Sequence, residues 1–570
     1  MVDPVTGDCL VFNGEIYNYP ELRESLAAVG VTVTSTGDAE VLLKGLSRWG
    51  EAFVEKLDGM YAFAFYKRAT RRVLLARDPL GIKPLYVAEH EGRIVFGSEI
   101  RSLLASGVVP DEYDPAGVAS YLAYGAPQDP LTIHRAIKSF PVGSFQWLEA
   151  DERGSLRIGP RVRFWRFPLP APAETMDAAV AATHEALSRS VRRQLASDVP
   201  LGVFLSGGID SGVIAALASE ASGQLKTFSV GFESENMASE LPIARETAAR
   251  IGSDHHEIMI GKADALNLWQ QWLAVADRPS VDGFNTFIVS KAARLGGAKV
   301  VLSGLGADEL FGGYANFFRV RRLAPWIRAA AALPLVARRF LATTATPLCP
   351  LRYRERLIML ATSSGRPVDV DIDIRRMLSA GALESLGLSA RDTGLSPNYL
   401  PAELYDLCEP ECRDEFQGVM RVESYCYMSN TLLRDSDINS MAHSLELRVP
   451  FLGREVVNVA ARTPGHLHLE HGTPKAVLRR AVGHLLPPLV LSRPKTGFSL
   501  PVGDWMYAEL RDACEAAVNA LQDVPFLDHS AVRGLWSSFS HQRRHSYWMK
   551  PTLLVSLGSY VANRSSSSTG

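Results

Sequence analysis

Ser206-Gly207-Gly208-Ile209-Asp210-Ser211, preceded by the apolar run Gly202-Val203-Phe204-Leu205, is the stretch that decides the fold. The apolar run is typical of a buried strand, and the residues after Ser211 are typical of a helix. The two glycines allow a tight turn and a close approach of the backbone to a ligand. The N–H groups of this turn and the dipole of the helix then converge on one point, which suits a phosphate.

The loop differs from a Walker loop, which places a lysine after its last glycine. It resembles the pyrophosphate loop of ATP pyrophosphatases, which cleave ATP between the α and β phosphates and form acyl-adenylates. Asp210 would hold Mg²⁺ against those phosphates. Taken alone, a Gly-Gly-x-Asp sequence is also compatible with an ordinary turn between a strand and a helix.

A second apolar run, Val300-Val301-Leu302, leads into the loop Ser303-Gly304-Leu305-Gly306-Ala307-Asp308-Glu309. Ligands of open α/β sheets bind at the carboxyl ends of the strands, so we expect the two loops to face each other. Asp210 and Asp308 would then form an all-oxygen site for Mg²⁺. The alternative is two surface turns whose acidic side chains are simply solvated.

The two loops resemble the synthetase domain of glutamine-hydrolysing asparagine synthetases. Five further segments, in the order of that family, carry the same resemblance: Phe12–Asn18, Leu57–Ala64, Ala76–Tyr86, Met441–Leu452 and Arg493–Phe498. The resemblance implies an α/β fold with two parts. An N-terminal glutamine amidotransferase domain, a layered α/β sandwich of the Ntn type, precedes an ATP pyrophosphatase domain with a doubly wound parallel sheet and helical additions.

Length and composition agree with a multidomain globular protein. The chain has 570 residues, of which 47% are hydrophobic and 21% are charged. Its formal net charge of −2 gives no bulk attraction to nucleic acid or to anionic membranes, and weighs against a tRNA-modifying pyrophosphatase. No apolar run reaches the length of a membrane span, and the first residues do not resemble a secretory signal.

Cysteine is rare, which fits a reducing compartment, and we expect a cytoplasmic protein. Cys408 and Cys412 have no second pair at zinc-site spacing, so we expect both to be structural. His255-His256-Glu257 also suggests a metal site, but adjacent residues of a strand point to opposite sides, and we expect a structural role there too.

Strand and helix patterns divide the chain into four parts. Residues 1–105 are expected to form the glutamine amidotransferase type-2 domain without its N-terminal segment, and 106–175 a connecting region. Strand–helix alternation over 176–562 predicts the parallel sheet of the synthetase domain. Within it, residues 320–440 are expected to be mainly helical, with solvated arginine-rich faces. Residues 563–570 are expected to be a disordered tail.

The glutaminase of the resembled family uses a cysteine at residue one, with its own α-amino group as the base. This chain starts with Met1-Val2, and Cys9 lies inside an expected strand, so we expect Cys9 to be a core residue. The resemblance therefore implies a start some tens of residues into the domain and no glutamine hydrolysis by the chain as it stands. Met1 is either an internal methionine of a longer chain or the start of a protein that uses free ammonia.

The other side of the glutamine pocket is present. By resemblance, Asn13 and Gly14 match the oxyanion hole, which stabilises a tetrahedral intermediate. Glu15 and Asp38 match positions that hold the amino group of glutamine. The nitrogen source is therefore glutamine or ammonia.

The resemblance implies two chemical steps with ATP and Mg²⁺ as cofactors. A substrate carboxylate attacks the α-phosphorus of ATP and releases pyrophosphate, and ammonia then displaces AMP from the acyl-adenylate. The protein must neutralise the pyrophosphate charge and exclude water. The expected ATP and pyrophosphate residues are Leu205, Ser206, Gly207, Gly208, Asp210, Ser211, Val230, Gly231, Ser303 and Gly304.

Further residues are assigned by resemblance as well. Lys475 matches a family lysine near the phosphates, where its point charge would stabilise the leaving group; a surface helix lysine is the alternative. Lys495 is a weaker candidate for the same role. Asp308 and Glu309 join Lys475 as expected catalytic residues. Glu446 and Arg448 are expected to line the acceptor pocket, although a plain ion pair explains them equally well.

The second loop departs from the family pattern. Asparagine synthetases have Ser-Gly-Glu-Gly where this chain has Ser303-Gly304-Leu305-Gly306, and leucine neither accepts a proton nor orients ammonia. Another base is needed, for which Glu309 or the substrate itself is a candidate. Gly453 stands where the family usually has aspartate.

Three functions therefore stay open. The first is ATP-dependent amidation of aspartate to asparagine. The second is an amidotransferase or cyclising ligase acting on another carboxylic acid. The third is a non-catalytic nucleotide-binding relative. The expected partners are small molecules, namely ATP, the carboxylic acid, and glutamine or ammonia. A homodimer is left open, and neither nucleic acid nor a membrane is expected.

Overall fold

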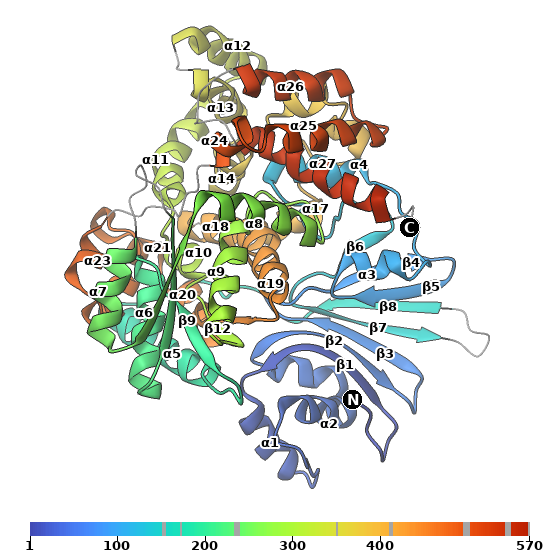
Figure 1. Cartoon of the computed structure of the whole chain (residues 1–570), viewed down its shortest axis with the longest axis vertical. Coiled ribbons are helices and arrows are strands. Elements are labelled where there is room, and N and C mark those ends of the chain that lie inside the picture. Colours follow the sequence, from blue (N-terminus) through green and yellow to red (C-terminus); the bar gives the residue numbers. More distant parts are fainter. Residues whose placement is uncertain are drawn as a thin grey trace.

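The computed structural model describes residues 1–150, 156–171, 174–232, 240–348, 351–409, 414–493, 502–541 and 549–567. Two antiparallel sheets form the N-terminal part, in the strand orders β1-β2-β3-β7-β8 and β5-β4-β6 (Figure 1). Their strands are β1 (Cys9–Ile16), β2 (Gly59–Lys67), β3 (Arg72–Arg77), β4 (Tyr86–His90), β5 (Arg93–Gly97), β6 (Ile137–Ser139), β7 (Ser144–Ala150) and β8 (Leu156–Arg163). The helices of this part are α1 (Tyr19–Ala27), α2 (Asp38–Trp49), α3 (Ile100–Ala105) and α4 (Pro115–Tyr124).

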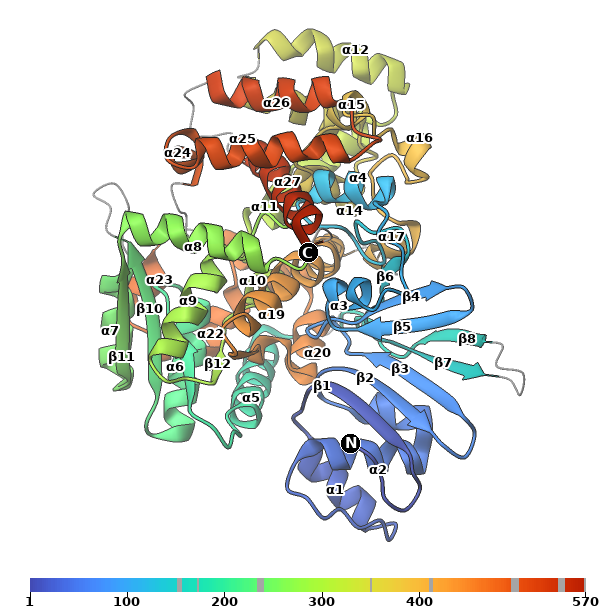
Figure 2. The ribbon, with the colours of Figure 1, turned by 45° about the vertical axis from the view of Figure 1, so that its right-hand side comes forward.

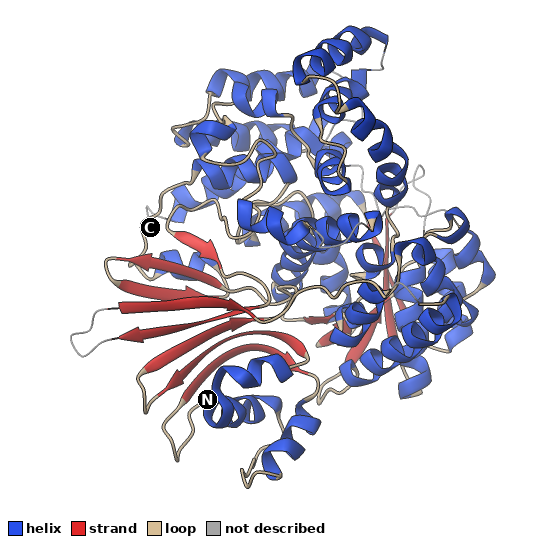
Figure 3. Ribbon diagram, turned by 180° about the vertical axis from the view of Figure 1, so that it is seen from behind, coloured by secondary structure: helices blue, strands red, loops and turns tan. Residues whose placement is uncertain are grey.

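Strand β2 explains why these sheets are layered. Tyr61, Phe63 and Phe65 belong to one core with residues of α1 and α2, whereas Ala62 and Ala64 belong to a second core with residues of the three-stranded sheet. Alternate residues of a strand point to opposite faces, so β2 is buried on both sides. The result is a sandwich of helices, sheet and sheet, with α3 covering the outer face of the smaller sheet. Figure 3 shows the stacked strands from behind.

The region expected to connect the two domains adds strands to both sheets. Strands β7 and β8 complete the larger sheet, and β7 pairs with β3 through Ala76 and Phe145. Strand β6 pairs with β4 in the smaller sheet. The larger sheet of the N-terminal domain therefore extends to Arg163.

A five-stranded parallel sheet forms the centre of the second part, in the order β11-β10-β9-β12-β13. Its strands are β9 (Leu201–Phe204), β10 (Lys226–Phe232), β11 (Asp254–Ile260), β12 (Val300–Leu302) and β13 (Glu446–Arg448). Helices α5 (Met176–Gln194), α6 (Ile209–Ser222), α7 (Leu241–Ile251), α8 (Lys262–Val275) and α9 (Phe284–Leu295) accompany it. After β9, the chain adds β10 and β11 on one side of this strand and later β12 and β13 on its other side. The order in which strands are added to the sheet therefore reverses at β9.

Helical additions make up the rest of the chain. They are α10 (Ala307–Phe311), α11 (Ala315–Ala330), α12 (Leu335–Ala345), α13 (Leu351–Thr362), α14 (Pro367–Arg375), α15 (Ala380–Ser385), α16 (Ala390–Thr393), α17 (Ala402–Cys408), α18 (Glu415–Val422), a π-helix (Glu423–Leu432), α19 (Leu433–Met441), α20 (Arg454–Arg462), α21 (Gly465–His468), α22 (Ala476–Val482), α23 (Pro488–Ser492), α24 (Val502–Tyr507), α25 (Arg511–Ala520), α26 (His529–His541) and α27 (Met549–Ser567). Helices α12, α25 and α26 lie at the upper end of the chain in Figures 1 and 2, whereas α20 and α23 lie lower, near the parallel sheet. None of the described helices combines the length and apolar content needed to cross a bilayer.

The expected tail is partly wrong. Residues 563–567 belong to the last turns of α27, and 568–570 lie outside the described residues. The two parts of the chain share one continuous core, in which Tyr17 and Met60 join Val203 and Phe228. Ion pairs such as that between Lys83 Nζ and Asp437 Oδ1, at 2.8 Å, also cross between them. The glutaminase-like and synthetase-like parts are thus held in one arrangement.

Candidate functional site

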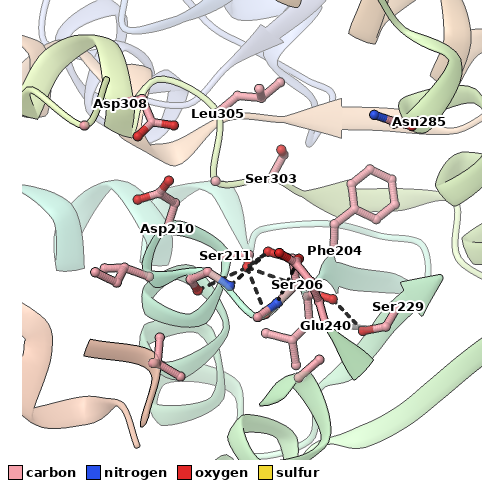
Figure 4. Close-up of a pocket in the computed structure, with 18 of the residues that line it drawn as sticks. Phe204, Ser206, Asp210, Ser211, Ser229, Glu240, Asn285, Ser303, Leu305 and Asp308 are labelled. Atoms are coloured by element: carbon pink, nitrogen blue, oxygen red, sulfur yellow. Dashed lines mark hydrogen bonds between the residues drawn. The ribbon is translucent and has the colours of Figure 1, made fainter. Parts of the chain in front are cut away.

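A cavity of about 490 Å³ lies at the carboxyl ends of β9 and β12, where the chain direction across the sheet reverses (Figure 4). The two loops expected to meet do face each other across it. Of the predicted ATP and pyrophosphate residues, all except Gly231 line this cavity. Those that line it are Leu205, Ser206, Gly207, Gly208, Asp210, Ser211, Val230, Ser303 and Gly304.

Hydrogen bonds inside the first loop hold its backbone in place. The Ser206 N–H donates to the Ser211 hydroxyl at 3.0 Å, and the two serine hydroxyl oxygens lie 2.9 Å apart. The Gly208 N–H donates to the Ser206 hydroxyl at 3.2 Å. A Cβ at Gly207 would lie 2.9 Å from Arg493 Nη1, so a side chain there would displace the Arg493 guanidinium. The loop is therefore shaped before any ligand arrives.

Lys475 joins the two loops through its ammonium group. Its Nζ lies 2.5 Å from Asp210 Oδ1 and 2.6 Å from Asp308 Oδ1, and its side chain is buried. Burial alone would lower the pKa of the ammonium, but the two carboxylates outweigh burial and raise this pKa above its usual value. The structure thus places a permanent positive charge where the two glycine-rich loops meet.

Asp210 and Asp308 are suited to bind a divalent cation only together with further ligands such as phosphate oxygens. Among the described residues, no group of three or more His, Cys, Asp or Glu side chains is arranged to hold a metal. Asp210 and Asp308 supply two carboxylates, and Mg²⁺ in proteins is usually bound by one or two carboxylates together with substrate phosphates and water. The donor set is that of a metal–nucleotide complex rather than of a resident structural ion.

A buried acid lies beside this charged centre. Glu309 is 1% exposed, and the Tyr314 hydroxyl donates a hydrogen bond of 2.6 Å to its Oε1. Burial, followed by the charge of Asp308, raises the pKa of Glu309 to about 7. Tyr314 is packed in turn against Arg375, whose guanidinium lies 4.8 Å from the ring centroid. Leu305, Glu309 and Tyr314 all line the cavity, so an apolar side chain and a titratable acid share this end.

Several residues that line the cavity have no role predicted from the sequence, and Tyr314, Glu240 and Arg493 are among them. Tyr314 follows Gly312-Gly313 directly after the acidic loop, and that position was the available signal. Glu240 accepts a hydrogen bond of 3.4 Å from the Gly207 N–H, and Arg493 Nη1 lies 3.6 Å from Glu240 Oε1. No local pattern links Glu240 to the loop, whereas Arg493 begins one of the segments that carry the family resemblance.

The four residues expected to bind glutamine lie together at the start of the chain. Gly14 has a φ of 147° and lies against β2, so that a Cβ there would come within 2.0 Å of the Met60 carbonyl oxygen. The Asn13 amide donates to the Ser98 hydroxyl at 3.1 Å. Asp38 accepts the Ile16 N–H at 2.9 Å. Burial, followed by the charge of Asp38, raises the pKa of Glu15 to about 7.

Arg448 and Glu446 do not line the cavity expected to hold the acceptor. Arg448 is buried at the end of β13, and its guanidinium lies 3.5 Å from Glu15 Oε2 and 2.6 Å from Glu446 Oε1. Its backbone carbonyl accepts a 2.9 Å hydrogen bond from the Ser303 N–H. One residue therefore reaches Glu15 with its side chain and the loop after β12 with its backbone.

The remaining predictions concern residues outside the cavity. Lys495 and Cys412 lie outside the described residues. Cys9 is in β1, as expected, but is only half-buried and contributes to no core cluster. Cys408 is buried, 3.6 Å from Cys426. His255 shares a hydrogen bond of 2.8 Å with Thr227, while His256 stacks on a phenylalanine ring, so the two histidines point apart.

Comparisons with known proteins agree with this division of the chain. A family model described as asparagine synthase matches residues 182–560, and one described as glutamine amidotransferase domain matches residues 1–157. A Mycobacterium tuberculosis protein, provisionally named a glutamine-hydrolysing asparagine synthetase, is 34% identical over 538 residues, which cover 92% of this chain and 79% of that protein. The chain belongs to the asparagine synthase family.

Further relatives include a second asparagine synthetase and a protein with a different name. Asparagine synthetase 1 of Bacillus subtilis, named as glutamine-hydrolysing, is 33% identical over 506 residues, covering 88% of this chain and 77% of that protein. Amidase chry2 of Gibberella zeae is 28% identical over 327 residues, covering 54% of this chain and 47% of that protein. Similarity of sequence therefore extends to proteins whose names do not include asparagine.

One of the two departures from the family pattern has a structural cause. Gly453 precedes α20, and a Cβ at this position would lie 2.4 Å from Ser190 Oγ on α5. A larger residue there would displace the Ser190 hydroxyl, which donates a 2.7 Å hydrogen bond to the Pro450 carbonyl, so the packing of this chain favours glycine. Leu305, in contrast, borders the cavity and changes its chemistry directly.

Proposed function

We propose that this chain forms asparagine from aspartate, using ATP to make a β-aspartyl-adenylate and releasing pyrophosphate and AMP. The observation that carries the proposal is the Lys475 ammonium between Asp210 and Asp308, at the meeting point of two glycine-rich loops. Membership of the asparagine synthase family supports the same activity. A lysine with a purely structural role would not require two glycine-rich loops to converge on its ammonium group beside a cavity.

In the first step, the aspartate β-carboxylate attacks the α-phosphorus of ATP. The new bond joins carboxylate oxygen to phosphorus, and the α–β bridging bond breaks with its electron pair leaving on pyrophosphate. The Lys475 ammonium and the dipole of α6, whose N-terminus follows the first loop, would stabilise the charge that collects on this leaving group. Mg²⁺, when bound by Asp210, Asp308 and the phosphates, would neutralise further phosphate charge.

In the second step, ammonia attacks the activated carbonyl carbon. The C–N bond forms, the bond from that carbon to the phosphate oxygen breaks, and AMP leaves with the electron pair. One proton must then leave the nitrogen. Leu305 accepts no proton, whereas Glu309, with a pKa of about 7, changes charge near neutral pH. Glu309 is therefore the base of this step, and Tyr314 orients its carboxylate.

Ammonia would come from glutamine if a nucleophilic cysteine acts together with the glutamine-binding residues of the N-terminal domain. Asn13 and Gly14 would stabilise the oxyanion, while Glu15 and Asp38 would hold the glutamine amino group. The short distance between Arg448 and Glu15 is consistent with a site built against the synthetase domain.

A second candidate function keeps the first step and changes the acceptor. Leu305 is the observation that favours it, because this apolar side chain stands where asparagine synthetases have glutamate. The acceptor would then be a carboxylic acid other than aspartate, with its own amine or ammonia as the nucleophile.

ATP–pyrophosphate exchange in the presence of Mg²⁺ separates these functions. Aspartate-dependent exchange, followed by asparagine formation when ammonia is added, would support the first function. Exchange with another carboxylic acid but not with aspartate would favour the second. Absence of exchange with every acid tested would contradict both and leave a nucleotide-binding relative. The Asp210→Asn variant is the matched control, and it should abolish exchange in every case.

A further inference from the structure

Helix α12 carries an apolar face that the described part of the chain leaves uncovered. Val336, Phe340 and Leu341 are 79%, 67% and 55% exposed. Val336 and Phe340 are one helical turn apart and so lie on the same face. The other side of the helix is packed: Ala342 is buried, and Arg338 donates hydrogen bonds to carbonyl oxygens of the segment 361–363. Figures 1 and 2 show α12 at the outer end of the helical additions.

Large apolar side chains on both sides of α12 are also exposed. Leu333 and Leu348 flank the helix at 47% and 90% exposure, and Trp326 in the preceding α11 is 76% exposed. Leu335, in α12 itself, is 44% exposed. Scattered exposed hydrophobic residues need no explanation, but seven within one short segment indicate an interaction surface. We call this set the α12 surface: Trp326, Leu333, Leu335, Val336, Phe340, Leu341 and Leu348.

The same segment is strongly basic. Residues 315–348 contain six arginines and no lysine, aspartate or glutamate, although the whole chain has a net charge of −2. Arg322 and Arg319 lie four and seven positions before Trp326, and these helical spacings place all three residues on one side of α11. Arg319, Arg321, Arg322 and Arg339 are exposed, and no ion pair joins them to any carboxylate among the described residues.

The combination of apolar and basic groups selects the partner. A symmetric contact with a second copy would bring arginines against arginines, because the same patch meets itself in such a dimer. Nucleic acid would satisfy the arginines but leave the apolar face in water. An anionic lipid bilayer meets both requirements, because its headgroups attract arginine and its acyl region accepts Phe, Leu and Trp side chains.

We propose that the α12 surface attaches this protein to anionic lipid bilayers. Helix α12 lies along the headgroup region, with Val336, Phe340 and Leu341 inserted and the arginines of α11 against lipid phosphates. This is peripheral attachment and not a membrane span. The expectation of no membrane partner rested on the net charge of the whole chain, which conceals a positive segment of this size.

Sedimentation with sucrose-loaded vesicles tests the proposal on the full chain. The protein should sediment with vesicles of one part phosphatidylglycerol to three parts phosphatidylcholine, and not with pure phosphatidylcholine. Binding should weaken as salt rises, since the arginine contribution is screened. Equal binding to both kinds of vesicle, or to neither, would overturn the proposal.

Matched variants identify the surface. Val336→Ser/Phe340→Ser should reduce vesicle binding at least about tenfold through lost apolar burial. Arg319→Gln/Arg322→Gln should reduce it by about fivefold for each arginine. The controls Leu295→Ser, at an apolar residue 76% exposed, and Arg48→Gln, at an exposed arginine, should bind as the unmodified chain does.

Two outcomes would refute the assignment. Vesicle binding that survives both double substitutions would mean that another surface is responsible. A concentration-dependent mass in light scattering that Val336→Ser/Phe340→Ser abolishes would assign the face to a contact between copies. All four altered positions are exposed, so unchanged circular dichroism and unchanged melting confirm that any lost binding is not unfolding.

Discussion

Substituting Glu309 by glutamine separates the two proposed steps, because the acid is placed beside the charged centre and not within it. The Glu309→Gln variant should retain ATP–pyrophosphate exchange and lose amide formation by a factor of about 10²–10⁴, the usual contribution of a general base. Equal loss of both activities would refute the role of Glu309 as the base of the second step.

The pH dependence of amide formation provides a second, quantitative test of the role of Glu309. A carboxyl group with a pKa of about 7 is mostly protonated at pH 6 and mostly ionised at pH 8. The base is the ionised form, so amide formation normalised to exchange should fall about tenfold from pH 8 to pH 6. Tyr314→Phe removes a hydrogen bond that lowers this pKa, so the midpoint should move to higher pH. An unchanged profile in Glu309→Gln would contradict the assignment.

Stability should change in the opposite direction to activity. The pKa of Glu309 is raised from 4.5 to about 7 on folding, so ionising it in the folded state opposes folding. This penalty is absent below pH 4.5, grows up to pH 7 and is complete above it, where it reaches about 3 kcal/mol. Glu309→Gln should therefore raise the melting temperature at pH 8 and raise it much less at pH 5. A drop in melting temperature at pH 8 would mean that the carboxylate is stabilising.

Three further predictions concern the loops and the contact between domains. Lys475→Met leaves two carboxylates without their shared cation, so ATP–pyrophosphate exchange should be lost and the chain destabilised by about 3–5 kcal/mol, as judged by denaturant titration. Gly304→Ala places a Cβ 2.8 Å from the backbone of Asp210, so exchange should be abolished, whereas Gly37→Ala, which meets nothing within 4 Å, should have no effect. Arg448→Met removes a positive charge that lowers the pKa of Glu15. The pH midpoint of glutamine binding, measured by calorimetry, should therefore move upward. An unshifted midpoint would show that Arg448 and Glu15 are not coupled.

The sheet and the meeting of the two loops were predictable because they depend on local patterns. Strand β12 spans the apolar run Val300–Leu302 that predicts it, and β9 covers most of the apolar run before the first loop. The two loops face each other because the carboxyl ends of neighbouring parallel strands share one edge of a sheet. Long-range pairing was not predictable in the same way. Strand β7 pairs with β3, although more than sixty residues of the chain separate them. Nothing in the local sequence near Ser144 indicates this pairing.

The side-chain positions of Glu446 and Arg448 were not predictable for a related reason. Glu446 and Arg448 follow a motif that ends near the synthetase loops, and a resemblance in sequence carries no side-chain direction. In the fold, alternate residues of β13 share a face, and both side chains point to the N-terminal domain while the backbone between them serves the sheet. Glu446 and Arg448 thus lie outside the cavity at the carboxyl ends of β9 and β12, and a role of either in binding the acceptor stays a prediction.

Asp308 and Glu309 show how one loop can supply two chemistries. Adjacent residues of a helix project about 100° apart, so the first turn of α10 sends one acid toward Lys475 and the next toward Tyr314. Lys475 favours the ionised form of Asp308, and the resulting negative charge adds to burial in raising the pKa of Glu309. A buried acid whose pKa is raised to about 7 is suited to accept a proton near neutral pH, which is the role proposed for Glu309. With leucine at position 305, Glu309 allows the loop to keep a base for amide formation.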